Sequence, residues 1–139
     1  MKKMQKFISL LLCAAMLLGT APVSAGAASG PVIRPSGYSA YPGNTVSIPI
    51  YADGLEQMAA LDFDLYYDPD VLTYESWSRG WLFDDPSLIL SVHGSNPGLI
   101  RTSTIAYSGI SGSGEIFWFD FSVRPDAPPG RHRASDLCG

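Results

Sequence analysis

The sequence predicts an all-β protein folded as a β-sandwich, and three observations support this prediction. Beyond the first 30 residues helical periodicity is absent, and short β-rich runs alternate with clusters of Gly, Pro, Asn, Asp and Ser. Two of these runs alternate strictly between apolar and polar residues, which is the period of a half-buried strand. A strand face made of four successive apolar side chains requires a second sheet to cover it.

The first two expected strands flank a tight turn. Residues 32–40 are the first β-rich run, and Pro42-Gly43-Asn44 has the composition of a turn. Residues 45–51 then place their branched aliphatic side chains on one face. Pro49 has no N–H to donate, so we expect this strand at a sheet edge or with that nitrogen directed away from the ladder.

The clearest expected strand spans residues 58–67. Because a strand has a period of two, one face is fully apolar and the other is polar and acidic. The inner face consists of Leu61, Phe63, Leu65 and Tyr67, and the outer face of Ala60, Asp62, Asp64 and Tyr66.

The rest of the chain alternates between strands and turns. Strands are expected at residues 71–77, 87–92, 99–107 and 115–123, with a turn at 93–98 and a flexible loop at 108–114. The apolar residues of 99–107 fit neither register, so its facing stays open. In the last strand, three phenylalanines and Val123 face one way, and Ile116, Trp118, Asp120 and Ser122 face the other.

The outer face of residues 58–67 is the candidate binding site. If the strand that carries Trp118 and Asp120 pairs beside it, acids and aromatic rings share a flat patch. Such a patch suits a protein partner or a polysaccharide chain. The predicted partner-binding residues are Asp62, Asp64, Tyr66, Trp118 and Asp120.

The N-terminus predicts export. Residues 1–25 combine three lysines, an apolar run and small residues at the cleavage point, and Ala27 offers a second cleavage point. The apolar run is shorter than the roughly 20 residues that span a bilayer, so we expect an exported protein that is extracellular or at the cell surface and is not embedded in a membrane. The remaining chain has six arginines against thirteen acidic residues, a net charge of −7, which argues against a nucleic-acid partner.

Catalytic and metal-binding patterns are weak. Neither His93 nor His132 has a neighbour at metal-ligand spacing, and no G-x-S-x-G nucleophile motif occurs. Glycoside hydrolysis normally uses two acids from opposite walls of a cleft, whereas Asp62 and Asp64 lie on one strand. Acids in turns leave a structural calcium site as an alternative. Because none of these patterns is strong, the primary expectation is no catalytic residue, no cofactor and no metal.

Three segments carry recognisable motifs. Residues 42–50 read PGNTVSIPI, residues 61–72 read LDFDLYYDPDVL, and Gly114 to Val123 is followed by Ala127-Pro128-Pro129-Gly130. Together these segments resemble the cohesin domains of bacterial cellulosome scaffoldins, which belong to a superfamily that also contains carbohydrate-binding modules. The resemblance covers residues 31–130. It implies a jelly-roll sandwich, here lacking the family's last strand, which lies beside the first; residues 131–139 read as an irregular tail.

The resemblance also implies a function. A cohesin is a non-catalytic module that binds a dockerin on a secreted protein in polysaccharide-degrading assemblies, and the calcium belongs to the dockerin. Asp62 aligns with a recognition aspartate, whereas Ala60 stands where the best-known type has asparagine. Two alternatives remain, namely a polysaccharide-binding module on the same scaffold and a structural module of the cell surface.

Overall fold

The structure is a computed structural model that describes residues 30–128. The predicted signal peptide and the tail at 131–139 lie outside the described residues. The described part is almost entirely β-structure, joined by turns and one short 3₁₀-helix, as the sequence predicts. The elements are β1 (Val32–Pro35), β2 (Thr45–Tyr66), β3 (Leu72–Arg79), the 3₁₀-helix (Trp81–Phe83), β4 (Ile89–Asn96) and β5 (Leu99–Val123).

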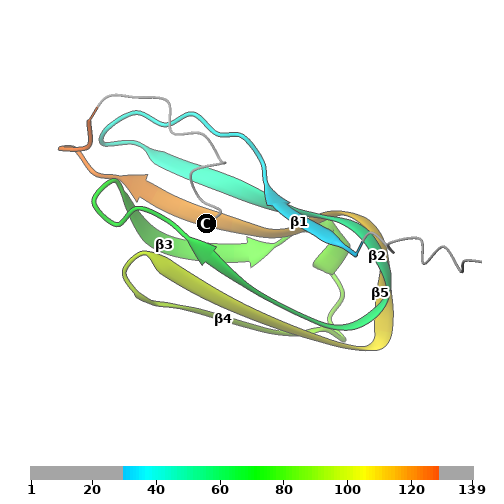
Figure 1. Cartoon of the computed structure of the whole chain (residues 1–139). Coiled ribbons are helices and arrows are strands. Elements are labelled where there is room, and N and C mark those ends of the chain that lie inside the picture. The colour runs from blue at the N-terminus through cyan, green and yellow to red at the C-terminus, as the bar shows by residue number, and fades with distance from the viewer. Residues whose placement is uncertain (1–29, 129–139) are drawn as a thin grey trace, which may run out of the picture.

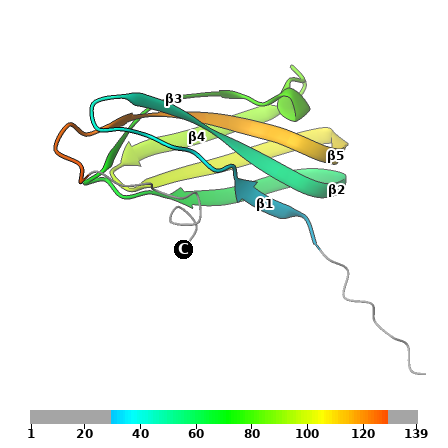
Figure 2. The same cartoon turned by 90° about the horizontal axis from the view of Figure 1, so that it is seen from above.

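Two long strands, β2 and β5, build both layers of a sandwich (Figures 1 and 2). In the first layer, residues 45–52 of β2 pair with residues 114–122 of β5, and β1 and β3 flank them. In the second layer, residues 60–66 of β2 pair with residues 99–105 of β5, and β4 pairs with the other side of β5. All of these pairings are antiparallel.

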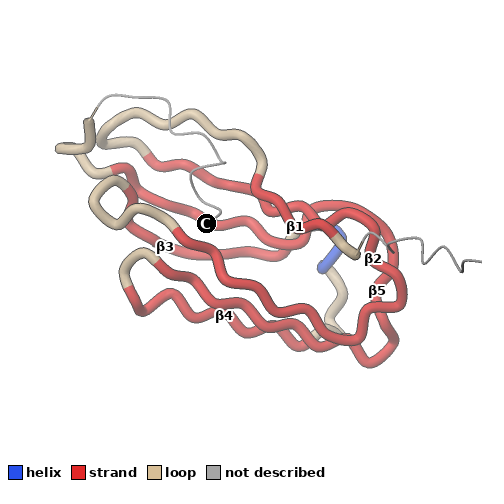
Figure 3. The backbone as a smooth tube through the Cα atoms, viewed as in Figure 1, coloured by secondary structure: helices blue, strands red, loops and turns tan. Residues whose placement is uncertain are grey.

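The two layers are joined by a bend at which β2 and β5 turn together (Figure 3). The expected loop at residues 108–114 is therefore wrong, because these residues stay paired with β2 through the bend. Ser111 Oγ accepts hydrogen bonds from the backbone N–H and the side chain of Gln57, at 2.9 and 3.2 Å. Gly112 takes a φ of +119°, which only glycine adopts readily, so the glycines mark a sharp bend rather than a flexible loop.

The core lies between the layers and is rich in aromatic rings. Phe63 of the second layer meets Phe117 of the first edge to face, with 5.8 Å between ring centroids. Tyr67 meets Phe121 in the same way at 5.1 Å. Such contacts add to the burial of apolar area that stabilises the sandwich.

The predicted inward faces are confirmed for residues 115–123 of β5 and residues 45–51 of β2. Phe117, Phe119, Phe121 and Val123 are buried, and so are Ile48 and Ile50 of β2. Ile116 is an exception, because it is fully buried although its expected face was the outer one. The register shifts here, since Ile50 pairs with Phe117 and Tyr51 with Glu115, so residue 116 is an extra residue that turns inward.

Pro49 lies inside the first layer rather than on its edge strand. β1 pairs with β2 only from Pro35 opposite Ile50 onward, so the position of Pro49 lies just past the end of that pairing. Within residues 30–128, β1 pairs with β2 alone, and no described strand pairs with its other edge.

Candidate functional site

The outer surface of the second layer is the candidate site, and we call it the Asp62 face. Its side chains form rows across three strands, because residues opposite each other in antiparallel strands share a face. Ala60, Ile105 and Ile89 make an apolar row, followed by Asp62, Ser103 and Ser91, and then by Asp64, Arg101 and His93. Tyr66 opposite Leu99 ends the series.

Exposed apolar side chains gather on this face. Four of the seven large apolar side chains exposed among residues 30–128 belong to it, namely Tyr66, Ile89, Ile105 and, two residues farther along β5, Tyr107. Tyr107 is 82% exposed, and the two isoleucines are 49% and 44% exposed. Apolar side chains grouped on a surface and bordered by polar ones are typical of a protein-binding site.

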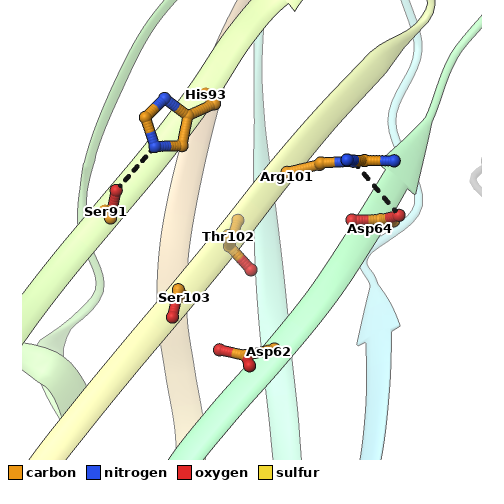
Figure 4. Close-up of a pocket in the computed structure, with 7 residues that line it drawn as sticks. All are labelled: Asp62, Asp64, Ser91, His93, Arg101, Thr102 and Ser103. Carbon is orange, nitrogen blue, oxygen red and sulfur yellow. Dashed lines mark hydrogen bonds and ion pairs between the residues drawn. The ribbon is translucent and has the colours of Figure 1, made fainter.

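A shallow hollow of about 330 Å³ lies in the polar part of the Asp62 face (Figure 4). Each of the three strands contributes two or three side chains to its lining. The lining residues are Asp62, Asp64, Ser91, His93, Arg101, Thr102 and Ser103.

The polar groups around this hollow are only loosely engaged. Arg101 Nε lies 3.7 Å from Asp64 Oδ2, which is an ion pair longer than a hydrogen bond. Ser91 Oγ and His93 Nε2 are hydrogen-bonded at 2.9 Å. Within the described part of the chain, the carboxylate of Asp62 has no hydrogen bond or ion pair. The hollow therefore presents a carboxylate and a guanidinium that remain available to a partner.

The outer surface of the first layer, which we call the Asp120 face, is different. Asp120 accepts hydrogen bonds from two serines on the neighbouring strands, from Ser47 on one side and from Ser76 at 2.8 Å on the other. Ser122 Oγ donates to Glu75 Oε1 at 2.6 Å. The polar groups of this face are largely satisfied by one another.

Two aromatic side chains of the Asp120 face share one carboxylate. Glu115 accepts a hydrogen bond from Tyr51 Oη at 2.9 Å and from Trp118 Nε1 at 3.2 Å. The hydrogen bond to Glu115 is the main cause that raises the pKa of the Tyr51 hydroxyl above its ordinary value. Arg34 lies over the Tyr51 ring and pairs with Asp53 at 2.8 Å. These rings are held in place by contacts within the protein.

The structure divides the five predicted site residues between the two faces. Asp62, Asp64 and Tyr66 lie together on the Asp62 face and are exposed, as predicted. Trp118 and Asp120 do not join them, because their partners in the ladder are Pro49 and Ser47 on one side and Ser78 and Ser76 on the other. The single patch expected from pairing these strands is therefore wrong. The physical reason is the bend, which separates the two halves of β5 into different layers.

Sequence reasoning missed most of the β4 and β5 contribution to the Asp62 face. The sequence predicts His93 in a turn, but β4 continues to Asn96, and Pro97 and Gly98 make the turn. The apolar residues of 99–107 fit neither register because two threonines occupy the inward face: Thr102 is 5% and Thr104 1% exposed. Assigning those threonines to the core would have placed Arg101, Ser103 and Ile105 outside.

Two further observations concern the described residues only. No group of three or more His, Cys, Asp or Glu side chains there is arranged to hold a metal ion. Residues 30–128 also contain no helix with the length and apolar character needed to cross a membrane.

Comparison with known proteins gives a family match. Residues 33–136 match the family model described as the cohesin domain, which is more than half of the chain. A comparison with curated proteins finds no match.

Solved structures share the fold at low sequence identity. The sixth cohesin of scaffoldin B of Acetivibrio cellulolyticus, solved in complex with a dockerin, is 21% identical with a TM-score of 0.67, over 73% of this chain and 77% of that one. A type I cohesin–dockerin complex from Clostridium thermocellum is 19% identical with a TM-score of 0.65, over 72% of this chain and 76% of that one. A non-cellulosomal cohesin of the archaeon Archaeoglobus fulgidus is 22% identical with a TM-score of 0.57, over 66% of this chain and 64% of that one.

Proposed function

This chain belongs to the cohesin domain family, and from that premise we propose that it binds a dockerin-bearing protein through the Asp62 face. Several of the solved structures that share its fold are cohesin–dockerin complexes, which supports a dockerin as the partner. The proposed setting is outside the cell, within an assembly that degrades polysaccharides. The proposed role is docking without catalysis, and any calcium belongs to the partner.

The contrast between the two faces is the observation that supports this choice of surface. The Asp62 face combines exposed apolar side chains with the unengaged carboxylate of Asp62, whereas the acids of the Asp120 face are occupied by serines and aromatic side chains. A partner gains free energy by covering apolar area and by meeting polar groups that are not yet satisfied. The Asp62 face offers both.

The test is direct binding to purified dockerins. The protein without its predicted signal peptide, residues 1–25, is titrated in solution with a panel of dockerins of both interaction types, and the affinities are measured by calorimetry. We expect at least one dockerin to bind, and the double variant Asp62→Ala/Asp64→Ala to weaken that binding by about tenfold or more, since hydrogen bonds to charged groups are lost.

The matched control removes two acids elsewhere. Glu56 and Asp84 are exposed, lie outside the Asp62 face and have no side-chain hydrogen bond within the described residues. Glu56→Ala/Asp84→Ala changes the net charge equally and should leave binding unchanged. Absence of binding across the panel would contradict the proposed function, and retention on insoluble polysaccharide that Trp118→Ala abolishes would favour a glycan-binding module.

A further inference from the structure

The arginines of the described chain differ sharply in how they are engaged. Arg34 pairs with Asp53 at 2.8 Å, and Arg124 pairs with Asp126 at 3.3 Å. Arg79 donates to the carbonyls of Phe83, Asp85 and Leu88 and so fixes the loop after β3. Arg101 makes no hydrogen bond within residues 30–128, and its nearest acid is at 3.7 Å. Its guanidinium is the least engaged cation in the described part of the chain.

The position of Arg101 makes its guanidinium accessible to a partner on the Asp62 face. Arg101 lies in the middle strand of the Asp62 face, directly between Asp64 on β2 and His93 on β4. Its side chain is 66% exposed, and it lines the hollow described above (Figure 4). Asp62 lies diagonally across from it, one row along, and has no partner of its own within the described residues. The hollow therefore has an available cation and an available anion in fixed positions.

We infer that Arg101, with His93 beside it, binds a carboxylate side chain of the docked protein, while Asp62 accepts from a donor on the same partner. This inference rests on the proposed function and adds the chemistry that selects the partner. A guanidinium binds a planar carboxylate through two parallel hydrogen bonds, which fixes orientation as well as position. The two complementary charges would set the direction in which the partner lies on the sheet.

A carboxylate fits better than a phosphate group. Asp62 and Asp64 both border the hollow, so a dianion placed over Arg101 would meet two negative charges nearby. A single carboxylate meets less repulsion. The exposed Ile89 and Ile105 in the adjoining row favour delivery of that carboxylate by a protein surface, which can cover them at the same time.

The test is a double-mutant cycle with a dockerin that binds the full chain. Each Asp and Glu on the dockerin's docking surface is changed to its amide, one at a time, and combined with Arg101→Gln. We expect Arg101→Gln to weaken binding by about tenfold, and one dockerin carboxylate to show a similar loss that is not added when both changes are present. Arg101→Lys should retain part of the affinity, because it keeps the charge and loses the paired geometry.

Arg124→Gln is the control, because Arg124 is also an exposed arginine with one carboxylate partner, Asp126, but lies outside the Asp62 face. It should change the affinity by less than about twofold. Thermal unfolding of each variant establishes that the fold is intact. If dockerins bind but every carboxylate change is additive with Arg101→Gln, the inference is overturned while the proposed function stands. If no dockerin binds, both are overturned.

Discussion

The two outer faces of this sandwich are built from the same two strands, yet their polar groups are used differently. On the Asp120 face, Asp120 lies between two serines that donate to it, and Glu115 accepts from two aromatic side chains. On the Asp62 face, Asp62 has no partner within the described residues, and Arg101 has only a long ion pair. A face whose polar groups satisfy one another contributes to stability, and a face that leaves them unsatisfied is available for binding.

The neighbouring strands explain this difference. In the first layer, β2 and β3 place serines on both sides of Asp120 of β5, so that carboxylate has a hydrogen-bond donor on each side. In the second layer, Ser103 lies opposite Asp62 and Arg101 opposite Asp64, but no hydrogen bond forms to either carboxylate among the described residues. The alternation along each strand is the same, and only the cross-strand neighbours differ.

The largest effect is expected from placing a long charged side chain on each face in turn. Ser103 is central to the Asp62 face, so Ser103→Arg should block the hollow and weaken dockerin binding by about a hundredfold, roughly 2.7 kcal/mol. Ser78→Arg is the matched change on the Asp120 face, where Ser78 is exposed opposite Trp118.

Ser78→Arg should leave the affinity within about twofold, because the surface it enters is not covered by the partner. Calorimetric titration of both variants with the same dockerin makes the comparison. Equal losses on the two faces would contradict the assignment of binding to the Asp62 face.

For the free energy of unfolding, the order of the two faces should be reversed, so that loss of an acid matters more on the Asp120 face. Asp120→Ala removes the acceptor of Ser47 and Ser76, so the free energy of unfolding should fall by about 1 to 2 kcal/mol. Asp62→Ala removes a carboxylate without a partner in the described structure, and should change the free energy of unfolding by less than about 0.5 kcal/mol. Urea unfolding measures both, and a larger loss for Asp62→Ala would show that the Asp62 face is also structural.

The sequence predicts the fold well because its signal is the alternation of side chains along single strands. The facings of residues 58–66 and of the three phenylalanines near the end of β5 are correct because each strand has one strictly apolar face. The candidate site is predicted only in part, since it depends on which strands pair. Asp62 and Asp64 are correctly placed outside, but nothing in their own strand shows that Arg101 rather than Asp120 lies beside Asp64.

The bend is the specific cause of this failure. A segment rich in glycine and serine reads as a loop, yet here it carries paired strands from one layer to the other. The two inward threonines add to the difficulty, because their hydroxyls make a core face resemble a solvent face. Ladder partners and the burial of polar residues are decided by tertiary packing, which a single sequence does not encode locally.

A smaller effect on the free energy of unfolding is expected from substituting these two threonines, which lie in the layer that carries the Asp62 face. Thr102 Oγ1 donates to the carbonyl of Phe63 at 2.9 Å, whereas Thr104 Oγ1 is the buried side-chain polar atom of residues 30–128 that lacks a partner. Thr104→Val should raise the free energy of unfolding by about 1 kcal/mol, since an unsatisfied hydroxyl is removed at constant shape. Thr102→Val loses a hydrogen bond and should not stabilise, and a gain for both would show that the hydroxyls are simply unfavourable in this core. Urea unfolding distinguishes the two outcomes.

The smallest effect concerns the shared carboxylate of the Asp120 face. The hydrogen bond to Glu115, followed by desolvation and the charge of Glu115, raises the pKa of Tyr51 above its ordinary value, so folding favours the protonated phenol. That contribution to stability is complete below the pKa of tyrosine in the unfolded chain and is lost as the pH rises through the folded value. In Glu115→Gln, the ultraviolet absorbance titration of Tyr51, isolated by difference against Tyr51→Phe, should shift toward lower pH. An unchanged titration would mean that desolvation, and not the contact with Glu115, holds the proton on Tyr51.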